Sequence, residues 1–196
     1  LFREVPDITT FVILDQTDMP NGSATVFPYP LVTVFPVIPV PNSPIGETED
    51  SLYEILAHEY THILNLNPVH GAMRPLSWIF GSIIRPNSYL PRWYAEGLAV
   101  YTESYFMPQG GRLRSQNFEG MVRAFTVDNK WDSLKIDQLN DFQPDWLGGR
   151  RAYLLGGALF YNLVERKSTE TIYTLNNTYS RRVPYFINAQ IGRAHV

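Results

Sequence analysis

The sequence predicts an α+β domain in which a small N-terminal sheet precedes a set of helices. Strand-like patterns occupy the first 40 residues, and helical periodicity begins at residue 51. Strands that come first and helices that follow are typical of this class. The length of 196 residues suits one domain, expected over residues 1–190, and a hydrophobic share of 44% supplies enough apolar material for its core.

Two strands are expected near the N-terminus. Residues 8–15 and Leu31–Ile38 are rich in β-branched and apolar side chains, which predicts a strand in each. Asn21-Gly22 between them marks a turn. Pro36 has no backbone N–H to donate, so the second strand should lie at a sheet edge or end there. As an edge, Leu31–Ile38 would offer a rim on which an extended peptide could lie.

A helix over residues 51–65 is expected after a proline-rich loop from Pro39 to Glu47. Ser51 and Glu54 have the spacing of a capping box, which predicts the start of this helix. An apolar stripe with helical spacing follows, and it predicts one buried face. The residues of the stripe are Leu52, Ile55, Leu56, Ile63 and Leu64.

The remainder of the chain is expected to be helical between irregular segments. Asn67 to Leu90 should form a loop with short helical stretches. Pro91 suits the first position of a helix that runs to about Tyr105. Further helices are predicted at residues 116–127, 133–140, 151–166 and 169–180. Residues 191–196 have no element pattern and are interpreted as a tail left by cloning.

Composition excludes several kinds of function. The formal net charge of −3 implies no basic face, so nucleic acid is not an expected partner. Cysteine is absent, which excludes disulfides, thiolate metal sites and a cysteine nucleophile. No apolar run approaches the roughly 20 residues of a membrane span. The chain starts at Leu1 without a Met, so we expect a fragment of a longer protein.

His58-Glu59-Tyr60-Thr61-His62 is the strongest functional signal. The two histidines are four positions apart, so on a helix they project from one face and can converge on one Zn²⁺ at about 2.0–2.1 Å. Glu59 is placed to reach a water and not the metal. This His-Glu-x-x-His arrangement is typical of zinc peptidases. The alternative is a helix whose histidine pair is satisfied by hydrogen bonds alone.

A catalytic zinc site needs a third protein ligand, and Glu96 is the best candidate. A glutamate in the first turns of an apolar helix is partly buried, which is costly without a cation. Gly97 weakens the helix, and close approach to the histidine-bearing helix would explain it. Glu103 is two turns further along the same face. It is expected either to accept a hydrogen bond from the far nitrogen of a ligating histidine or to be an exposed charge.

Other ligand arrangements are weaker. The metzincin pattern would require Gly and His where Asn65 and Pro68 stand. His70 lies in a loop just past the helix and is an alternative third ligand, although a surface position or the wall of a cleft suits it better.

Two motifs together carry a family resemblance, and weaker matches accompany them. The motifs are His58-Glu59-x-x-His62 and Trp93-x-x-Glu96-Gly97-x-Ala99-x-Tyr101-x-Glu103. The weaker matches are Ile79-Phe80-Gly81, Asn87-x-x-Leu90-Pro91, Gly111-Arg112 and Tyr153-x-x-Gly156-Gly157-x-x-Phe160-Tyr161. With these residues the chain resembles the gluzincins of the peptidase MA clan, and most of all the bacterial MA-like metallopeptidases that often precede a TolB/WD40-like β-propeller.

That resemblance implies a single Zn²⁺ held by His58, His62 and Glu96, with Glu59 as general base. It implies a thermolysin-like fold, in which the small N-terminal sheet lies over the active-site helix and a helical lobe follows. It also implies an extracytoplasmic location, in the bacterial periplasm or outside the cell, and a C-terminal β-propeller in the full-length protein.

The resemblance further implies a tyrosine that donates to the oxyanion, on the helix after the glutamate helix. Tyr153 is the first choice for this role and Tyr161, two turns on, is the second. Arg150 and Arg151 are charged substitutes.

The predicted function is a zinc metallopeptidase that hydrolyses peptide bonds with a metal-activated water, most simply an endopeptidase acting on peptides or proteins. Ala95 stands where related aminopeptidases have Asn, and their Gly-x-Met-Glu-Asn strand is absent, so an aminopeptidase is disfavoured. Two alternatives stay open: a zinc-stabilised peptide-binding module without hydrolysis, and a catalytic domain that needs a missing neighbouring domain.

Substrate contacts are predicted only coarsely. The irregular segments 66–90 and 106–116 are expected to form the substrate pocket, because binding residues often lie on loops. Arg112, Arg114 and Arg123 could meet a substrate carboxylate, but we favour solvated surface charges for all three.

Overall fold

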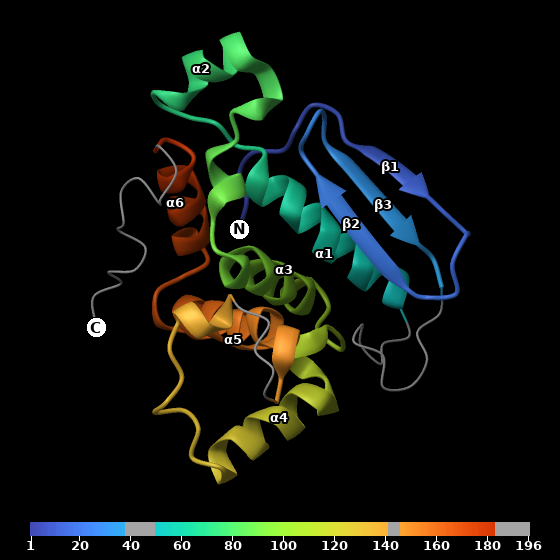
Figure 1. Cartoon of the computed structure of the whole chain (residues 1–196), viewed down its shortest axis with the longest axis vertical. Coiled ribbons are helices and arrows are strands. Elements are labelled where there is room, and N and C mark those ends of the chain that lie inside the picture. Colours follow the sequence, from blue (N-terminus) through green and yellow to red (C-terminus); the bar gives the residue numbers. More distant parts are fainter. Residues whose placement is uncertain (38–49, 141–145, 183–196) are drawn as a thin grey trace.

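A computed structural model describes residues 1–37, 50–140 and 146–182 of the chain. These residues form a three-stranded sheet followed by six α-helices, which confirms the α+β class (Figure 1). The sheet lies against one side of α1 (Ser51–Leu66), and α3 (Arg92–Phe106) crosses the other side. The residues of the proposed zinc site are therefore carried at the centre of the molecule.

The sheet contains β1 (Thr10–Ile13), β2 (Asn21–Thr25) and β3 (Leu31–Phe35) in the order β1-β3-β2. β1 pairs with β3 in parallel, and β2 pairs with β3 in antiparallel orientation. The strands expected at residues 8–15 and 31–38 are thus present with narrower bounds. The third strand, β2, was not predicted.

The turn expected at Asn21-Gly22 is wrong, because these residues begin β2. Tertiary packing overrides the local turn preference. Gly22 pairs with Val34 of β3, and its backbone approaches α1 so closely that an added Cβ would lie 2.8 Å from Ile55 Cγ2. Glycine at this position lets the strand lie directly on the helix.

β3 is the central strand, so the expected edge position and its peptide-binding rim are wrong. Both neighbours of β3 are strands, which leaves no free backbone for a peptide along it. The strand does end at Phe35, immediately before Pro36, as the missing N–H predicts. Ile38 and the proline-rich loop from Pro39 to Glu47 lie outside the described residues.

α1 begins at Ser51, but its N-cap differs from the predicted one. Asp50 is the N-cap, and its side chain accepts a hydrogen bond from Tyr53 N at 3.1 Å, so the predicted capping box is wrong. Glu54 is fully buried and faces Arg112 instead. Ile55 and Ile63 of the predicted stripe pack under the sheet with Val32 and Val34, whereas Leu52 is exposed.

α3 packs against α5 (Arg151–Arg166) at a crossing that only glycine permits. An added Cβ on Gly97 would lie 2.6 Å from Gly156 Cα. The explanation for Gly97 is therefore close approach to α5 and not to α1. A core cluster of Tyr94, Leu98, Tyr101, Phe160 and Ile172 surrounds this crossing.

Of the remaining predicted helices, those at residues 116–127 and 169–180 are present, and the one at residues 133–140 is not. α4 (Gln116–Val127) and α6 (Glu170–Tyr179) lie within a residue of the expected bounds. Residues 133–140 contain only a 3₁₀ turn at Asp137–Leu139 and not a helix. In residues 67–90 the chain forms α2 (Met73–Phe80) and two 3₁₀ turns, η1 (Gly81–Ile83) and η2 (Pro86–Tyr89). Every helix in the described ranges is too short or too polar to cross a bilayer.

Candidate functional site

α1 and α3 bring together the three side chains expected to hold a metal. The ligating atoms of His58, His62 and Glu96 all lie within 4.8 Å of one another. Glu96 Oε2 is 3.3 Å from His58 Nε2 and 3.4 Å from His62 Nε2. Two ligands that each lie about 2.0–2.1 Å from one tetrahedral ion are roughly 3.4 Å apart. The spacing of the three side chains is therefore compatible with a metal ion held between them.

The hydrogen bonding of His58 supports a cation between these groups. Its Nδ1 lies 3.0 Å from Glu103 Oε2, and a carboxylate can only accept, so this contact is a hydrogen bond when Nδ1 carries the proton. In the neutral ring Nε2 then has a lone pair that faces the Glu96 carboxylate. Two acceptors at this distance repel each other unless His58 is protonated or a metal ion lies between them.

Glu103 thus lies at the position expected of a residue that orients a ligating histidine. Its side chain is fully buried, which disagrees with the alternative of an exposed helix charge. Burial alone would raise the pKa of Glu103, but Arg112 and His58 outweigh it and lower the pKa to about 2. Glu103 is therefore ionised in the folded protein at neutral pH.

Arg112 is a site residue whose role the sequence analysis assigned wrongly. Its side chain is only 14% exposed, so the expectation of a solvated surface charge is wrong for this arginine. Its Nη2 donates to Glu103 Oε2 at 2.7 Å and its Nε to Glu103 Oε1 at 2.8 Å. Nη2 also lies 2.5 Å from His58 Nδ1, the ring nitrogen that faces Glu103 Oε2. Arg112 neutralises the carboxylate that holds His58.

The sequence offered Gly111-Arg112 only as a weaker match of the resemblance, and nothing local indicated that Arg112 pairs with Glu103. It reaches Glu103 because the chain reverses at Gly111, which has a left-handed φ of 81°. An added Cβ there would lie 2.5 Å from Ser104 Cα. The left-handed φ and this close approach therefore each require glycine at position 111. Arg123 agrees with the sequence expectation, since it is exposed and pairs with Glu119 one turn away on α4.

The two remaining carboxylates of the site have opposite pKa shifts. Burial would raise the pKa of Glu96, but the neighbouring imidazoles of His58 and His62 outweigh this effect and hold the pKa far below its usual value. Burial does raise the pKa of Glu59, against the opposing charges of the histidines. The raised pKa makes the Glu59 carboxylate a better proton acceptor than an ordinary glutamate, whereas the lowered pKa keeps Glu96 ionised, as a metal ligand must be.

The side chain of Glu59, a residue of α1, packs against the backbone at the start of β2. An added Cβ on Gly22 would lie 2.6 Å from Glu59 Cγ and 3.0 Å from Glu59 Oε1. The strand backbone therefore restricts where the Glu59 carboxylate can point.

Replacing Gly22 with alanine should lower kcat/KM for peptide hydrolysis by roughly 10²-fold, because a displacement of about 1 Å in a catalytic group can cost that much. Metal content should not change, since the atoms nearest an added Cβ belong to Glu59 and Ile55 and not to a predicted ligand. Gly120→Ala is the control, because an added Cβ there meets no atom within 4 Å. Unchanged hydrolysis by the Gly22 variant would show that β2 does not position Glu59.

The metal-ligand group opens into a cleft of about 740 Å³. One wall comes from Met19 to Ala24, and the opposite wall comes from α4 and the start of α5. Of the two segments expected to form the pocket, 66–90 contributes nothing to the lining, and 106–116 contributes Arg112 and Ser115. The wall of residues 19–24 had no signal in the sequence, because the strand it belongs to was read as a turn.

Tyr153 lies in this cleft above the ligands. Its ring stacks on that of His58 with the centroids 6.0 Å apart, and the guanidinium groups of Arg92 and Arg112 each lie 5.4 Å from its centroid. Burial and the nearby Glu96 raise the pKa of Tyr153, so the hydroxyl keeps its proton and can donate it.

Of the alternative oxyanion donors expected from the sequence, only Arg150 is among the residues that line the cleft. Tyr161 is 53% exposed and is not among the residues that line the cleft. Arg151 is buried and donates to Trp146 O at 3.2 Å. Arg150 does line the cleft.

His70 is not near the ligand group. Its Nδ1 lies 2.6 Å from Ser180 Oγ, and its Nε2 lies 2.9 Å from both carboxylate oxygens of Glu4. The imidazole ties the N-terminal segment to the end of α6, which is a structural role.

Comparison with known proteins adds no relative: the chain matches no family model, no curated protein and no solved structure. The resemblance to gluzincins therefore rests on the residues of this chain and stays a prediction. What can be said plainly is that the chain is an α+β protein in which two histidines and a glutamate form a group that could hold a metal ion.

Proposed function

We propose that this protein is a zinc-dependent peptidase with a thermolysin-like catalytic domain. One observation carries the proposal: the ligating atoms of His58, His62 and Glu96 gather within 4.8 Å, beside Glu59 and inside a cleft. A purely structural zinc site is closed by a fourth protein ligand, whereas three ligands that face a cleft leave a position for substrate.

Each residue has a defined task in this proposal. Zinc held by the three ligands would polarise a peptide carbonyl and lower the pKa of water toward 7. Glu59 takes a proton from the attacking water and returns it to the leaving amine. Glu103 fixes the tautomer of His58, and Arg112 keeps Glu103 ionised. Tyr153 donates a hydrogen bond from its hydroxyl to the oxyanion of the tetrahedral intermediate.

An extended peptide is the substrate that the cleft suits best. β2 is an edge strand of the sheet, and Asn21, Gly22 and Ala24 line the cleft. An edge strand presents unpaired backbone groups, so a peptide can bind by main-chain hydrogen bonds in register with it. This edge takes the place of the Leu31–Ile38 rim expected from the sequence.

The test is turnover of a peptide library by zinc-loaded protein, before and after chelation. We expect cleavage at internal peptide bonds that stops on chelation and returns with zinc. Zinc bound at one ion per chain without any cleavage would favour the non-hydrolytic module. Cleavage that survives full metal removal would contradict the proposal.

Tyr153→Phe should lower kcat by roughly 10²–10³ with little change in metal content, since it removes one oxyanion donor. Tyr161→Phe is the matched control, because that side chain is exposed outside the cleft lining. Wild-type kcat in the Tyr153 variant would reassign the donor, with Arg150 as the next candidate in the cleft.

The gluzincin assignment, the extracytoplasmic location and a C-terminal β-propeller remain predictions from the resemblance.

A further inference from the structure

An arm of the molecule carries a dense set of exposed apolar side chains. It consists of α2 and η1, and it projects at one end of the long axis (Figure 1). Its exposed residues include Leu76 (37%), Trp78 (76%), Ile79 (74%), Phe80 (55%) and Ile83 (65%). Such a contiguous group on a protein surface marks an interaction site.

The rest of the described structure does not cover these side chains. None of the three core clusters in residues 1–37, 50–140 and 146–182 includes a residue of α2 or η1. Leu76, Ile79 and Phe80 have the spacing of one helix face, so α2 presents an apolar face outward. Met73 is the buried residue of α2 and joins the arm to the body.

The charge of this region differs from that of the whole chain. The net charge is −3, yet no Asp or Glu occurs between Glu59 and Glu96. Arg74 is exposed on α2 and forms no salt bridge with a described residue, whereas Arg85, two residues after η1, is half-buried and donates to Ile84 O at 3.1 Å. The apolar arm therefore carries positive charge with no acidic residue beside it in the sequence.

We propose that the α2–η1 arm inserts into the surface of a membrane that contains anionic lipids. Trp, Phe and Ile on a short amphipathic segment are the side chains that enter the boundary between headgroups and acyl chains. Arg74, exposed on α2, supplies charge complementary to lipid phosphates. The apolar residues protrude at the end of the molecule (Figure 1), and none of them lines the cleft or the small pocket beside His70, which suits a fluid surface better than a rigid protein partner.

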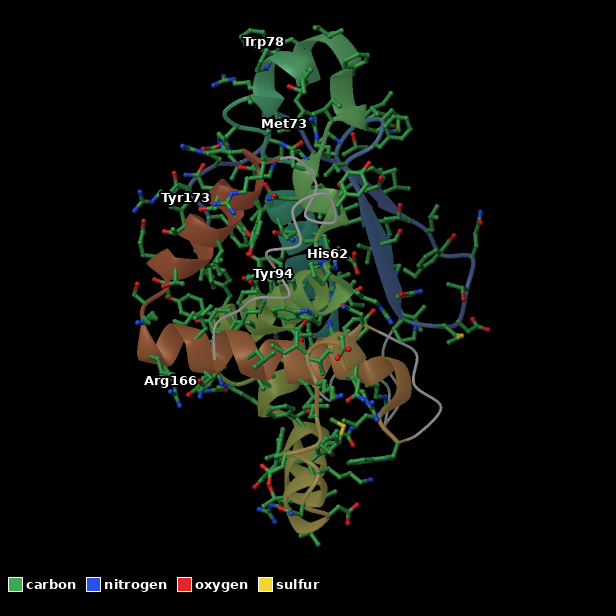
Figure 2. The ribbon with its side chains drawn as sticks, turned by 60° about the vertical axis from the view of Figure 1, so that its left-hand side comes forward. His62, Met73, Trp78, Tyr94, Arg166 and Tyr173 are labelled. Carbon is green, nitrogen blue, oxygen red and sulfur yellow. The ribbon has the colours of Figure 1, made fainter. Side chains whose placement is uncertain are left out.

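Binding by the arm would leave the cleft accessible. Trp78 lies at one end of the molecule, whereas His62 lies near its middle (Figure 2). The lining of the cleft includes no residue from 63 to 91. The inference therefore does not depend on peptidase activity, and either proposal can fail without the other.

The experiment is flotation of the protein with vesicles of phosphatidylcholine and phosphatidylglycerol in a roughly 2:1 ratio. We expect the protein to float with these vesicles, and to float much less with phosphatidylcholine alone. Lipids brominated on the acyl chains should quench the fluorescence of the wild type and leave Trp78→Phe nearly unquenched.

Variants identify the contribution of each part of the arm. Trp78→Ser/Ile79→Ser should lower partitioning at least ~10-fold, because it removes two inserting side chains. Arg74→Gln should lower it roughly fivefold and reduce its dependence on salt. Val127→Ser is the control, since Val127 is 83% exposed on α4 and distant from the arm. Circular dichroism checks that each variant is folded.

Two results would overturn the inference. One is partitioning that the Trp78→Ser/Ile79→Ser variant leaves unchanged. The other is a protein that ignores vesicles but self-associates through the arm, with association lost in the same variant, which would make the arm a protein docking surface.

Discussion

Glu59→Gln should abolish peptide hydrolysis while the protein keeps its metal. Glutamine has nearly the same shape but cannot accept the proton of the attacking water, so we expect kcat to fall by about 10²–10⁴ or more. The ligands His58, His62 and Glu96 are unchanged, and zinc content should stay at the wild-type level. The measurements are kcat on an internally quenched peptide and metal content of the same sample.

The matched control is Glu119→Gln, which removes an exposed carboxylate of α4 outside the cleft. Its kcat should equal that of the wild type. A purified Glu59→Gln protein that hydrolyses peptide at the wild-type rate would rule out Glu59 as the base, and with it the proposed mechanism. The Gly22→Ala variant should likewise lose hydrolysis and keep its metal. Its loss of activity should be smaller, because it displaces the Glu59 carboxylate without removing it.

The sequence predicted the helices well because their signals are local. The apolar periodicity of α5 and the position of Pro91 before α3 depend only on residues a few positions apart. The same locality placed His58 and His62 on one face of α1. Glu96 and Glu103 were likewise assigned to one helix face, since they are seven positions apart.

The parts that the sequence did not predict depend on contacts between distant segments. β2 consists of Asn-Gly-Ser-Ala-Thr, which has almost no apolar pattern, and it is a strand because it pairs with β3 and lies on α1. Arg112 depends on the chain reversal at Gly111. Gly97 was correctly noted as a close approach, but the helix that it meets could not be known from sequence, because Gly156 is far along the chain.

The buried charges of the site depend on one another. Glu103 bonds both His58 and Arg112, and the Nε atom of Arg112 also lies 3.8 Å from Glu54 Oε1. Removing one partner from such a buried pair leaves an uncompensated charge, at a cost of about 3–5 kcal/mol. Truncating Glu103 or Arg112 would therefore unfold the site as well as change its chemistry. Glu96 is the better residue for a test of metal binding, because it lies at the cleft.

Glu96→Ala should remove the metal and the activity together. A zinc ion left with two histidines has lost a charged ligand, and we expect its affinity to fall by more than the 10–100-fold that loss of an outer partner costs. Metal content after dialysis should fall from about one ion per chain to near zero. This pattern separates Glu96 from Glu59, whose variant loses activity and keeps the metal.

Folding must be checked in the same experiment, because the proposal concerns a ligand and not a structural residue. The Glu96 side chain lies at the cleft, and the crossing of α3 with α5 depends on Gly97 and Gly156, which the variant retains. We therefore expect a wild-type circular dichroism spectrum. Glu165→Ala, an exposed carboxylate on α5, serves as the control with full metal content. A folded Glu96→Ala protein that retains its zinc at wild-type affinity would show that the two histidines bind the ion with some other partner, and the assignment of Glu96 as the third ligand would be wrong.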